Sequence, residues 1–107
     1  MTDYSRGIVI SAKRQYWVYI MTNRWNTVLY IGVTNNIARR VVQHKSGKGG
    51  IFTRKYNIGK LMYIEMADDI HSAIRRDKEL KAGSREKKNA LITSVNPEWR
   101  DLSDDGF

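Results

Sequence analysis

The 107-residue sequence contains no cysteine, only two histidines and a single proline. Without cysteine the chain cannot form a disulfide, and two histidines alone do not make a structural zinc site. Any bound metal is therefore expected to be a hard cation on oxygen ligands. Long apolar runs are also missing: none approaches the roughly 20 residues that a membrane helix needs. The triplet Ile8 to Ile10 is too short for a signal-peptide core, so we expect a cytoplasmic protein with no membrane association.

Negative charge is scarce in this chain. It has 19 Lys plus Arg against 11 Asp plus Glu, which gives a formal net charge of +8. Such an excess in a small domain attracts polyanions, and nucleic acid is the commonest polyanion in the cell. A basic surface also keeps a protein soluble without any such partner. The hydrophobic share of 41% and the length are those of one globular domain.

The spacing of apolar residues predicts an α/β chain of the α+β type. Short runs rich in β-branched and aromatic residues indicate strands, and apolar residues one turn apart indicate helices. In chain order we expect strands at 16–21 and 28–32, a helix at 35–45, a strand at 61–65, a helix from Asp68 or Asp69 to about Ala82, and a helix from Ser84 up to Asn96. The order β-β-α-β-α-α gives a three-stranded, mainly antiparallel sheet flanked by helices.

The ends of these elements carry their own signals. Thr34 or Asn35 can cap the first helix, and Gly83 is expected to close the second in a left-handed conformation. No pattern assigns a structure to residues 52–56. We expect an N-terminal extension at 1–14, with an edge strand as an open alternative, one domain at 15–102, and a frayed acidic tail at 103–107.

Two tyrosines occupy the first two predicted strands. If the turn between these strands centres on Arg24 and Trp25, Tyr19 lies directly across from Tyr30, with Cβ atoms roughly 5 Å apart. Gly32 lacks a side chain where the chain leaves the second strand, so we expect a ligand or another backbone to come close there. The alternative is an ordinary aromatic pair in the core.

An acidic residue lies on the apolar face of the second predicted helix. At about 100° per residue, Asp77 falls inside the stripe formed by four apolar residues, Ile70, Ala73, Ile74 and Leu80. A buried carboxylate needs a cation, a metal or a proton to offset its desolvation. Asp77 is therefore a candidate metal ligand. The alternatives are an ion pair with Arg40 or a solvated carboxylate at the rim.

Together these residues resemble the motifs of the GIY-YIG nucleases, including the catalytic domain of the excision-repair incision subunit. The likeness spans about Tyr16 to Leu102 and is carried by Val18 and Tyr19, by Tyr30, Ile31 and Gly32, by Arg40 and His44, and by Asp77. Two positions depart from the family pattern: Trp17 replaces the glycine of the first motif, and Asp77 replaces the usual glutamate.

This resemblance implies a metal-dependent endonuclease that hydrolyses phosphodiester bonds in DNA, with a role in DNA repair. One Mg²⁺ or Mn²⁺ would be held by Asp77, a tyrosine would act as general base, and Arg40 would stabilise the charge on the phosphate. The resemblance leaves open whether Tyr19 or Tyr30 is the base; we name Tyr19 first, with Tyr30 orienting the water or the phosphate. His44 can be catalytic or can hydrogen-bond the following loop. The rival hypotheses are a nucleic-acid-binding module with this fold and little or no catalysis, and a basic interaction protein without a nucleic-acid role.

Basic residues gather around a glycine-rich loop at 46–50 and along the last two helices. The expected contacts to a nucleic-acid backbone are Arg39, Lys45, Lys48, Arg54, Lys55, Lys81, Lys87 and Lys88. Some of them can equally be solvated helix faces. Trp25 can stack on a base or pack against Trp17. DNA is the expected partner, RNA is an alternative, and targeting can involve a protein partner or self-association.

Overall fold

The computed structural model describes residues 15–106, so the predicted extension at 1–14 lies outside the described residues. Three strands form one antiparallel sheet in the order β3-β2-β4, with β2 (Tyr16–Thr22) between β3 (Leu29–Thr34) and β4 (Lys60–Ala67). The predicted α+β fold is confirmed. The segment with no predicted structure contributes a short additional helix, α2 (Ile51–Lys55).

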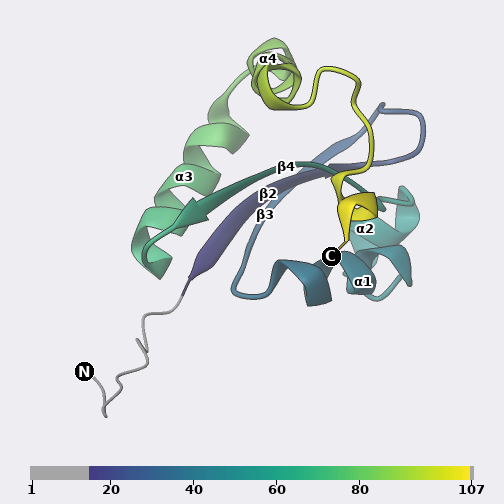
Figure 1. Cartoon of the computed structure of the whole chain (residues 1–107), viewed down its shortest axis with the longest axis horizontal. Coiled ribbons are helices and arrows are strands. Elements are labelled where there is room, and N and C mark those ends of the chain that lie inside the picture. The colour runs from purple at the N-terminus through teal and green to yellow at the C-terminus, as the bar shows by residue number, and fades with distance from the viewer. Residues whose placement is uncertain (1–14, 107) are drawn as a thin grey trace.

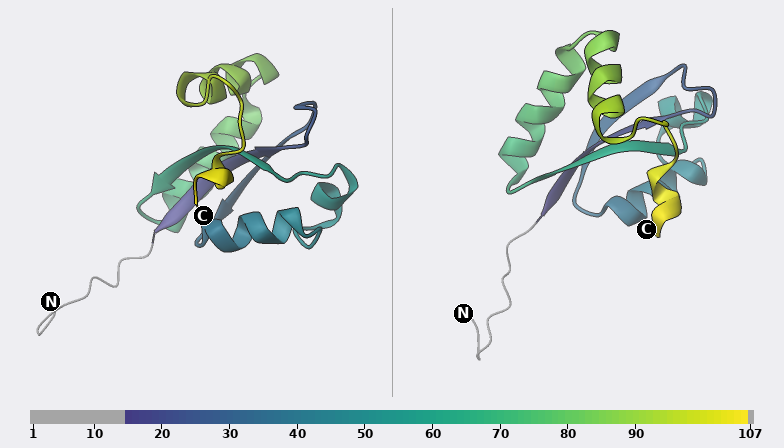
Figure 2. Two further views of the ribbon diagram at one scale, coloured as in Figure 1. Left: turned by 45° about the vertical axis from the view of Figure 1, so that its right-hand side comes forward. Right: turned by 45° about the horizontal axis from the view of Figure 1, so that its top comes forward.

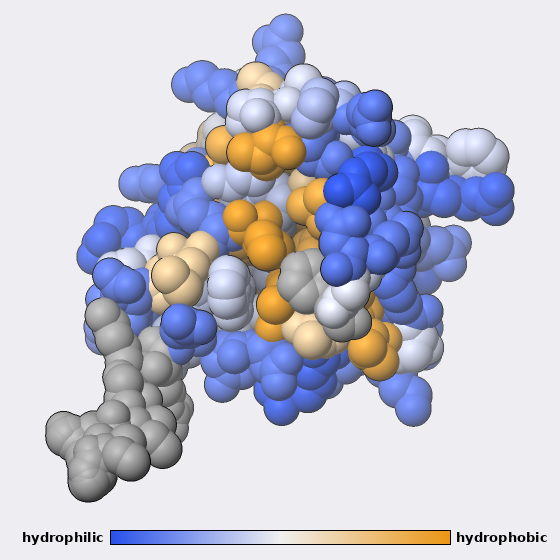
Figure 3. All heavy atoms as spheres, viewed as in Figure 1, coloured by the Kyte–Doolittle hydropathy of each residue, from blue (hydrophilic) through white to orange (hydrophobic). Residues whose placement is uncertain are grey.

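The helices lie on both faces of the sheet. α1 (Ile37–Lys45), α2 and the 3-10 helix η1 (Leu102–Asp105) lie on one face, and α3 (Ile70–Ala82) and α4 (Arg85–Val95) lie on the other (Figures 1 and 2). Successive side chains of a strand point to opposite faces. Val18 and Ile20 therefore pack under α3 and α4, whereas Tyr19 and Met21 pack under α1. Apolar side chains gather between the helices, and hydrophilic residues surround them (Figure 3).

The register of the β2–β3 hairpin differs from the predicted one. Tyr19 pairs with Gly32, and Tyr30 pairs with Met21, so the expected direct pairing of Tyr19 with Tyr30 is wrong. The cause is the side chain of Asn23, whose oxygen accepts hydrogen bonds from the backbone N–H groups of Thr27 and Val28 at 2.9 and 3.2 Å. These bonds end β2 and close a loop that extends to Val28. The centre of the turn therefore lies one residue later than the expected centre at Arg24 and Trp25.

The tip of this hairpin is held by charged side chains from elsewhere in the fold. Arg85, at the start of α4, donates hydrogen bonds to the carbonyls of Asn26 and Thr27 at 2.8 and 3.1 Å. Lys60 donates to the Asn26 side chain at 2.9 Å. The ring of Trp25 at the tip is 70% exposed, with the Arg24 guanidinium 4.6 Å from its centroid. Trp25 is therefore presented to solvent instead of being buried beside Trp17.

The helix caps follow the predicted chemistry with two corrections. Asn36 caps α1 by accepting from the Arg39 N–H. This cap lies one residue after Asn35, the later of the two caps expected. Asp69 and Ser84 cap α3 and α4 as predicted. Gly83 has φ −73° and ψ 158°, so its expected left-handed conformation is wrong: the chain turns directly from α3 into an extended residue before α4.

Residues 103–105 belong to η1, contrary to the frayed tail expected at 103–107, and Phe107 lies outside the described residues. The Asp101 carboxylate accepts hydrogen bonds from the Leu61 N–H at 3.0 Å and from Lys45 at 2.6 Å, which ties it to β4 and to the end of α1. Arg100 pairs with Asp105 at 2.8 Å. Within residues 15–106 no helix is both long and apolar enough to cross a membrane.

Candidate active site

A hydrogen-bonded cluster surrounds the hydroxyl group of Tyr19. Tyr19 lies in the middle of the central strand and is 1% exposed. Arg40 Nε donates to its Oη at 3.1 Å, and His44 Nε2 lies 3.1 Å from the same oxygen. Arg40 and His44 lie one turn apart on α1, so both reach across the face of the sheet to Tyr19. The structure thus brings together three residues that the sequence predicted for one site.

Burial controls the protonation of this cluster. Desolvation raises the pKa of Tyr19 in spite of the opposing effect of Arg40. Desolvation, together with the positive charge of Arg40, lowers the pKa of His44 to about 4, so the imidazole is neutral at pH 7. Tyr19 Oη accepts from Arg40, which can only donate, and shares a second hydrogen bond with Nε2 of the neutral His44, whose direction depends on the imidazole tautomer. Tyr19 therefore links the Arg40 guanidinium to the neutral imidazole of His44.

His44 lies against a small cavity of about 130 Å³ between α1 and α2. It is 3% exposed, and its Nδ1 has no hydrogen-bond partner among the described residues. Gly49 packs against this nitrogen so closely that a Cβ at position 49 would overlap it. The predicted placement of His44 beside Arg40 is confirmed. Its position buried behind Tyr19 argues against contact with a substrate phosphate, and its hydrogen bond goes to Tyr19 instead of to the loop.

Gly32 provides the space for the Tyr19 ring. A Cβ at this position would lie 2.6 Å from Tyr19 Oη and 2.7 Å from Cζ. The close approach predicted at Gly32 therefore exists, but it is made by the tyrosine of the first motif and not by a ligand or another backbone. The two motifs meet because Tyr19 and Gly32 are paired across the hairpin.

Tyr30 is the more accessible of the two tyrosines. It is partly exposed, and its ring lies 6.2 Å from that of Tyr19 and 5.4 Å from that of His44, centroid to centroid. Hydrogen bonding and charge interactions with both phenols raise the pKa of Arg40, so the guanidinium stays positively charged beside them. Tyr30 also lines a cavity of about 240 Å³ with Phe52. Of the two tyrosines, Tyr30 is therefore the one that borders this cavity.

Asp77 lies on α3 and is bound to a lysine. Its side chain is 13% exposed, and Oδ2 lies 3.0 Å from Lys81 Nζ. The ion pair with Arg40, one of the alternatives considered, does not form. Oδ1 is buried and has no hydrogen-bond partner among the described residues. Lys81 and Lys88 line the cavity at Tyr30, so the Asp77–Lys81 pair borders that opening.

The apolar stripe predicted around Asp77 is only half correct. Ala73 and Leu80 are buried, but Ile70 and Ile74 are 36% and 41% exposed. α3 contacts the sheet along the side that carries Ala73, Asp77 and Leu80, and the flank that carries Ile70 and Ile74 is exposed. Helical periodicity identified the apolar side but not how much of it a neighbour covers.

The single carboxylate at this site fits a magnesium-type ion. Within residues 15–106 no group of three or more His, Asp or Glu side chains could hold a metal by themselves. Mg²⁺ commonly binds through one or two carboxylates, with waters and substrate phosphate as the other ligands. The unpartnered Oδ1 of Asp77 is a suitable donor for that arrangement. Asp77 is also close enough to Tyr19 to raise the pKa of this tyrosine by charge repulsion.

The predicted nucleic-acid contacts fall into two groups. Two of the lysines are engaged in ion pairs: Lys45 with Asp101 and Lys81 with Asp77. The others are exposed or partly exposed and have no carboxylate partner within residues 15–106: Arg39, Lys48, Arg54, Lys55, Lys87 and Lys88.

Sequence reasoning missed three residues that support the site. Gln43 accepts from Arg40 Nη1 at 2.9 Å, and the Gly49 carbonyl accepts from Nη2 at 3.2 Å. Phe52 lies beside Tyr30, with 6.1 Å between ring centroids. Gln43 could have been found from its i+3 spacing to Arg40 on the helix. The other two depend on the fold of the loop and α2, which the sequence did not indicate.

Comparison with known proteins gives a consistent result. A model of the GIY-YIG catalytic domain matches residues 15–89. A UPF0213 protein of Syntrophus aciditrophicus is 39% identical over 83 residues, which cover 77% of this chain and 93% of that protein. A UPF0213 protein of Natronomonas pharaonis is 36% identical over 77 residues, covering 72% and 89%. The solution NMR structure of the UPF0213 protein BH0048 from Bacillus halodurans matches with a TM-score of 0.53 and 27% identity, covering 86% of this chain and 97% of that one.

Proposed function

This chain belongs to the GIY-YIG family, and from that premise we propose that it is a metal-dependent endonuclease that hydrolyses phosphodiester bonds in DNA. One observation carries the proposal: Arg40 is hydrogen-bonded to Tyr19 and lies near Tyr30, which borders a cavity lined by Lys81, the partner of Asp77. A cation for phosphate, a phenol and a carboxylate with a free oxygen are the groups that phosphodiester hydrolysis requires. The resemblance to the incision domain makes DNA repair in the cytoplasm the proposed setting.

Arg40 is the proposed phosphate-binding group. Its bonds to Tyr19, Gln43 and the Gly49 carbonyl use three of the five N–H groups of a guanidinium. The side chain is thus held in place and can still donate to a phosphate oxygen. A prearranged cation of this kind contributes on the order of 10² to 10³ in rate. Tyr19 acts as a positioning residue, because its buried hydroxyl holds Arg40 and is not open to water.

Tyr30 is the proposed general base. It borders the cavity, whereas the Tyr19 hydroxyl is already bonded to Arg40 and burial raises the pKa of that phenol. In the proposed reaction Tyr30 takes a proton from the attacking water while Arg40 binds the phosphate. Asp77 Oδ1 would hold one Mg²⁺ or Mn²⁺, which would supply Lewis-acid stabilisation of the charge on the leaving oxygen. Lys81 offsets the charge of this carboxylate in the free protein.

The test is cleavage of labelled duplex, single-stranded and branched DNA with Mg²⁺ or Mn²⁺, and with EDTA as the metal-free control. Tyr30→Phe and Asp77→Ala should each lower kcat by at least about 100-fold with little change in DNA affinity. Tyr19→Phe should lower it less, because Arg40 retains its bonds to Gln43 and Gly49. Tyr56→Phe, at an exposed tyrosine directly after α2, is the matched control and should leave cleavage unchanged.

One observation supports a second candidate, a nucleic-acid-binding module with little or no catalysis. The short carboxylate of Asp77 is already neutralised by Lys81. In that case the wild-type protein binds the same DNA panel in a salt-sensitive manner without cutting it, and Asp77→Ala leaves the affinity unchanged. Cleavage that survives EDTA or Asp77→Ala would refute the metal-dependent mechanism.

A further inference from the structure

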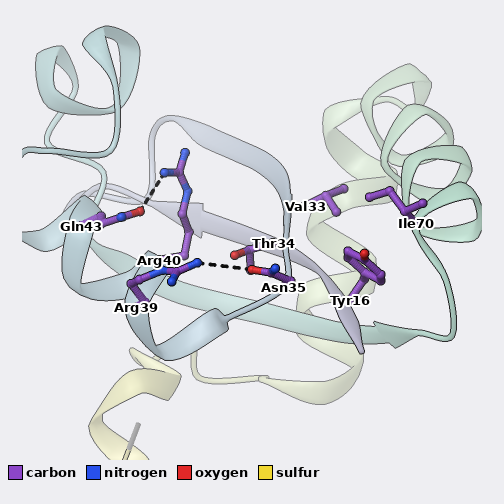
Figure 4. Close-up of a pocket in the computed structure, with 8 residues that line it drawn as sticks. All are labelled: Tyr16, Val33, Thr34, Asn35, Arg39, Arg40, Gln43 and Ile70. Carbon is purple, nitrogen blue, oxygen red and sulfur yellow. Dashed lines mark hydrogen bonds between the residues drawn. The ribbon is translucent and has the colours of Figure 1, made fainter. Parts of the chain in front are cut away.

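A second cavity, of about 360 Å³, adjoins the candidate active site. It lies between α1 and the start of α3, across the end of β3 (Figure 4). Arg40 lines this cavity and also donates to Tyr19, so the cavity and the proposed catalytic cluster share one guanidinium. The volume lies within the range of small-molecule sites, about 300 to 1,000 Å³. The mechanism proposed above makes no use of this space.

The two sides of the cavity differ in character. On the side of α1 lie Arg39, Arg40 and Gln43, and on the opposite side lie Tyr16 and Ile70 (Figure 4). No carboxylate is present among the described residues that line it. A site with cations on one side and apolar groups on the other is complementary to a molecule that is anionic at one end and flat and apolar at the other.

Arg39 is available to bind an anion in this cavity. Within residues 15–106 its guanidinium makes one side-chain hydrogen bond, from Nη2 to the Asn35 side chain at 3.3 Å, and it has no acidic partner. It follows Arg40 directly in the sequence, and both line the same space. Two adjacent arginines on one helix can therefore bind two successive phosphates of one strand.

The apolar side of the cavity is only partly buried among the described residues. Ile70 belongs to the apolar side of α3 but is 36% exposed. Tyr16, at the start of β2, is only partly buried and offers an aromatic ring to the same space. Aromatic side chains next to basic ones are the means by which proteins hold unpaired bases. An exposed isoleucine beside such a ring extends this apolar surface.

We propose that this cavity binds one unpaired nucleotide next to the phosphodiester that is cut. Arg39 binds its phosphate, and its base lies against Tyr16 and Ile70. A base can reach this wall only when it has left the duplex stack, so the substrate class is nucleic acid with an unpaired nucleotide beside the cleavage position, such as a flap, gap or single strand. This proposal rests on the proposed nuclease function, because the unpaired nucleotide is placed relative to the phosphate that Arg40 binds and that is cut.

The first test does not depend on cleavage. Deoxyadenosine monophosphate, deoxyribose 5-phosphate and inorganic phosphate are titrated into isotope-labelled protein, and the backbone amide signals of Thr34, Asn35 and Arg39 are followed by NMR. The nucleotide should bind at least about tenfold more tightly than the sugar phosphate, as expected for one stacked base. Tyr16→Ser should remove this difference, and Tyr16→Phe should preserve it.

Arg39→Gln should weaken the binding of all three ligands, whereas Arg75→Gln, at an exposed arginine on α3 that does not line the cavity, should not. Equal affinity for the three ligands, or shifts confined to Tyr30 and Phe52, would overturn the proposal.

In the second test, Tyr16→Ser should raise KM about tenfold for a substrate with an unpaired nucleotide beside the cut, with kcat nearly unchanged. No difference between paired and unpaired substrates would also overturn it. Nucleotide binding in the cavity by a protein that cuts nothing would support the site and refute the nuclease function.

Discussion

The protonation of His44 links the stability of the fold to pH. His44 is almost fully buried between Tyr19, Tyr30 and Gly49, and Arg40 is the charged group beside it. Burial and Arg40 lower its pKa from 6.5 to about 4 in the folded protein. In the unfolded chain the imidazole therefore takes up a proton at a higher pH than in the native state. Between pH 6.5 and about pH 4 the unfolded state binds more protons than the native state, so stability must fall as the pH falls.

The size of this effect follows from the same two values. A lowering of the His44 pKa from 6.5 to about 4 corresponds to about 3 kcal/mol in the free energy of unfolding. About 2 kcal/mol of it should be lost between pH 7 and pH 5, where only the unfolded chain is protonated at this position. For a domain of this size that loss is a large part of the usual total stability.

The measurement is urea unfolding at pH 7, 6 and 5 for the wild-type protein and for His44→Gln, which keeps a polar group next to Tyr19. The wild type should lose about 2 kcal/mol more than the variant over this range. Carboxylates such as Asp101, whose pKa is lowered, lose their contribution in both proteins, so they cancel in the difference. Parallel pH profiles for the two proteins would refute the buried, neutral His44.

Two further predictions concern the packing of the site and the C-terminal segment. Gly32→Ala should lower the free energy of unfolding by about 1 to 3 kcal/mol, because its Cβ would displace the Tyr19 ring, and this cost should shrink in a Tyr19→Ala background. An equal cost in both backgrounds in urea unfolding would contradict the steric explanation. Asp101→Ala should cost about 2 to 3 kcal/mol by the same assay, since it leaves the Leu61 N–H without its acceptor. Lys45→Ala, the control, removes only a partly exposed ion pair and should cost less than about 1 kcal/mol.

Much of the fold could be predicted because local signals agreed with one another. Alternating and helical patterns gave the order of strands and helices, and Asp69 and Ser84 identified the start of two helices. The hairpin register could not be predicted in this way. It depends on bonds from the Asn23 side chain to the backbone of Thr27 and Val28, which strand patterns do not reveal.

The candidate site was predictable to a similar extent. The motifs correctly indicated that Tyr19, Arg40 and His44 come together. Nothing in them showed that Tyr19 would be covered, because this depends on the glycine across the hairpin and on α1 above it. The exposure of Ile70 also depends on tertiary contacts, since periodicity describes one helix and not the extent of its neighbours.

The anchoring of the hairpin tip has a consequence for motion within the site. Arg85 joins the loop before β3 to α4, and α4 follows α3 directly in the chain. Tyr30 on β3 and Asp77 on α3 are thereby linked through a brace outside the site as well as through the sheet. Groups held in this way need little reorganisation when a reaction begins, and reduced reorganisation is itself a source of rate. In the proposed mechanism, a hairpin released from Arg85 would keep Tyr30 and Asp77 but hold them less firmly relative to each other, although Arg85 itself lies outside the site.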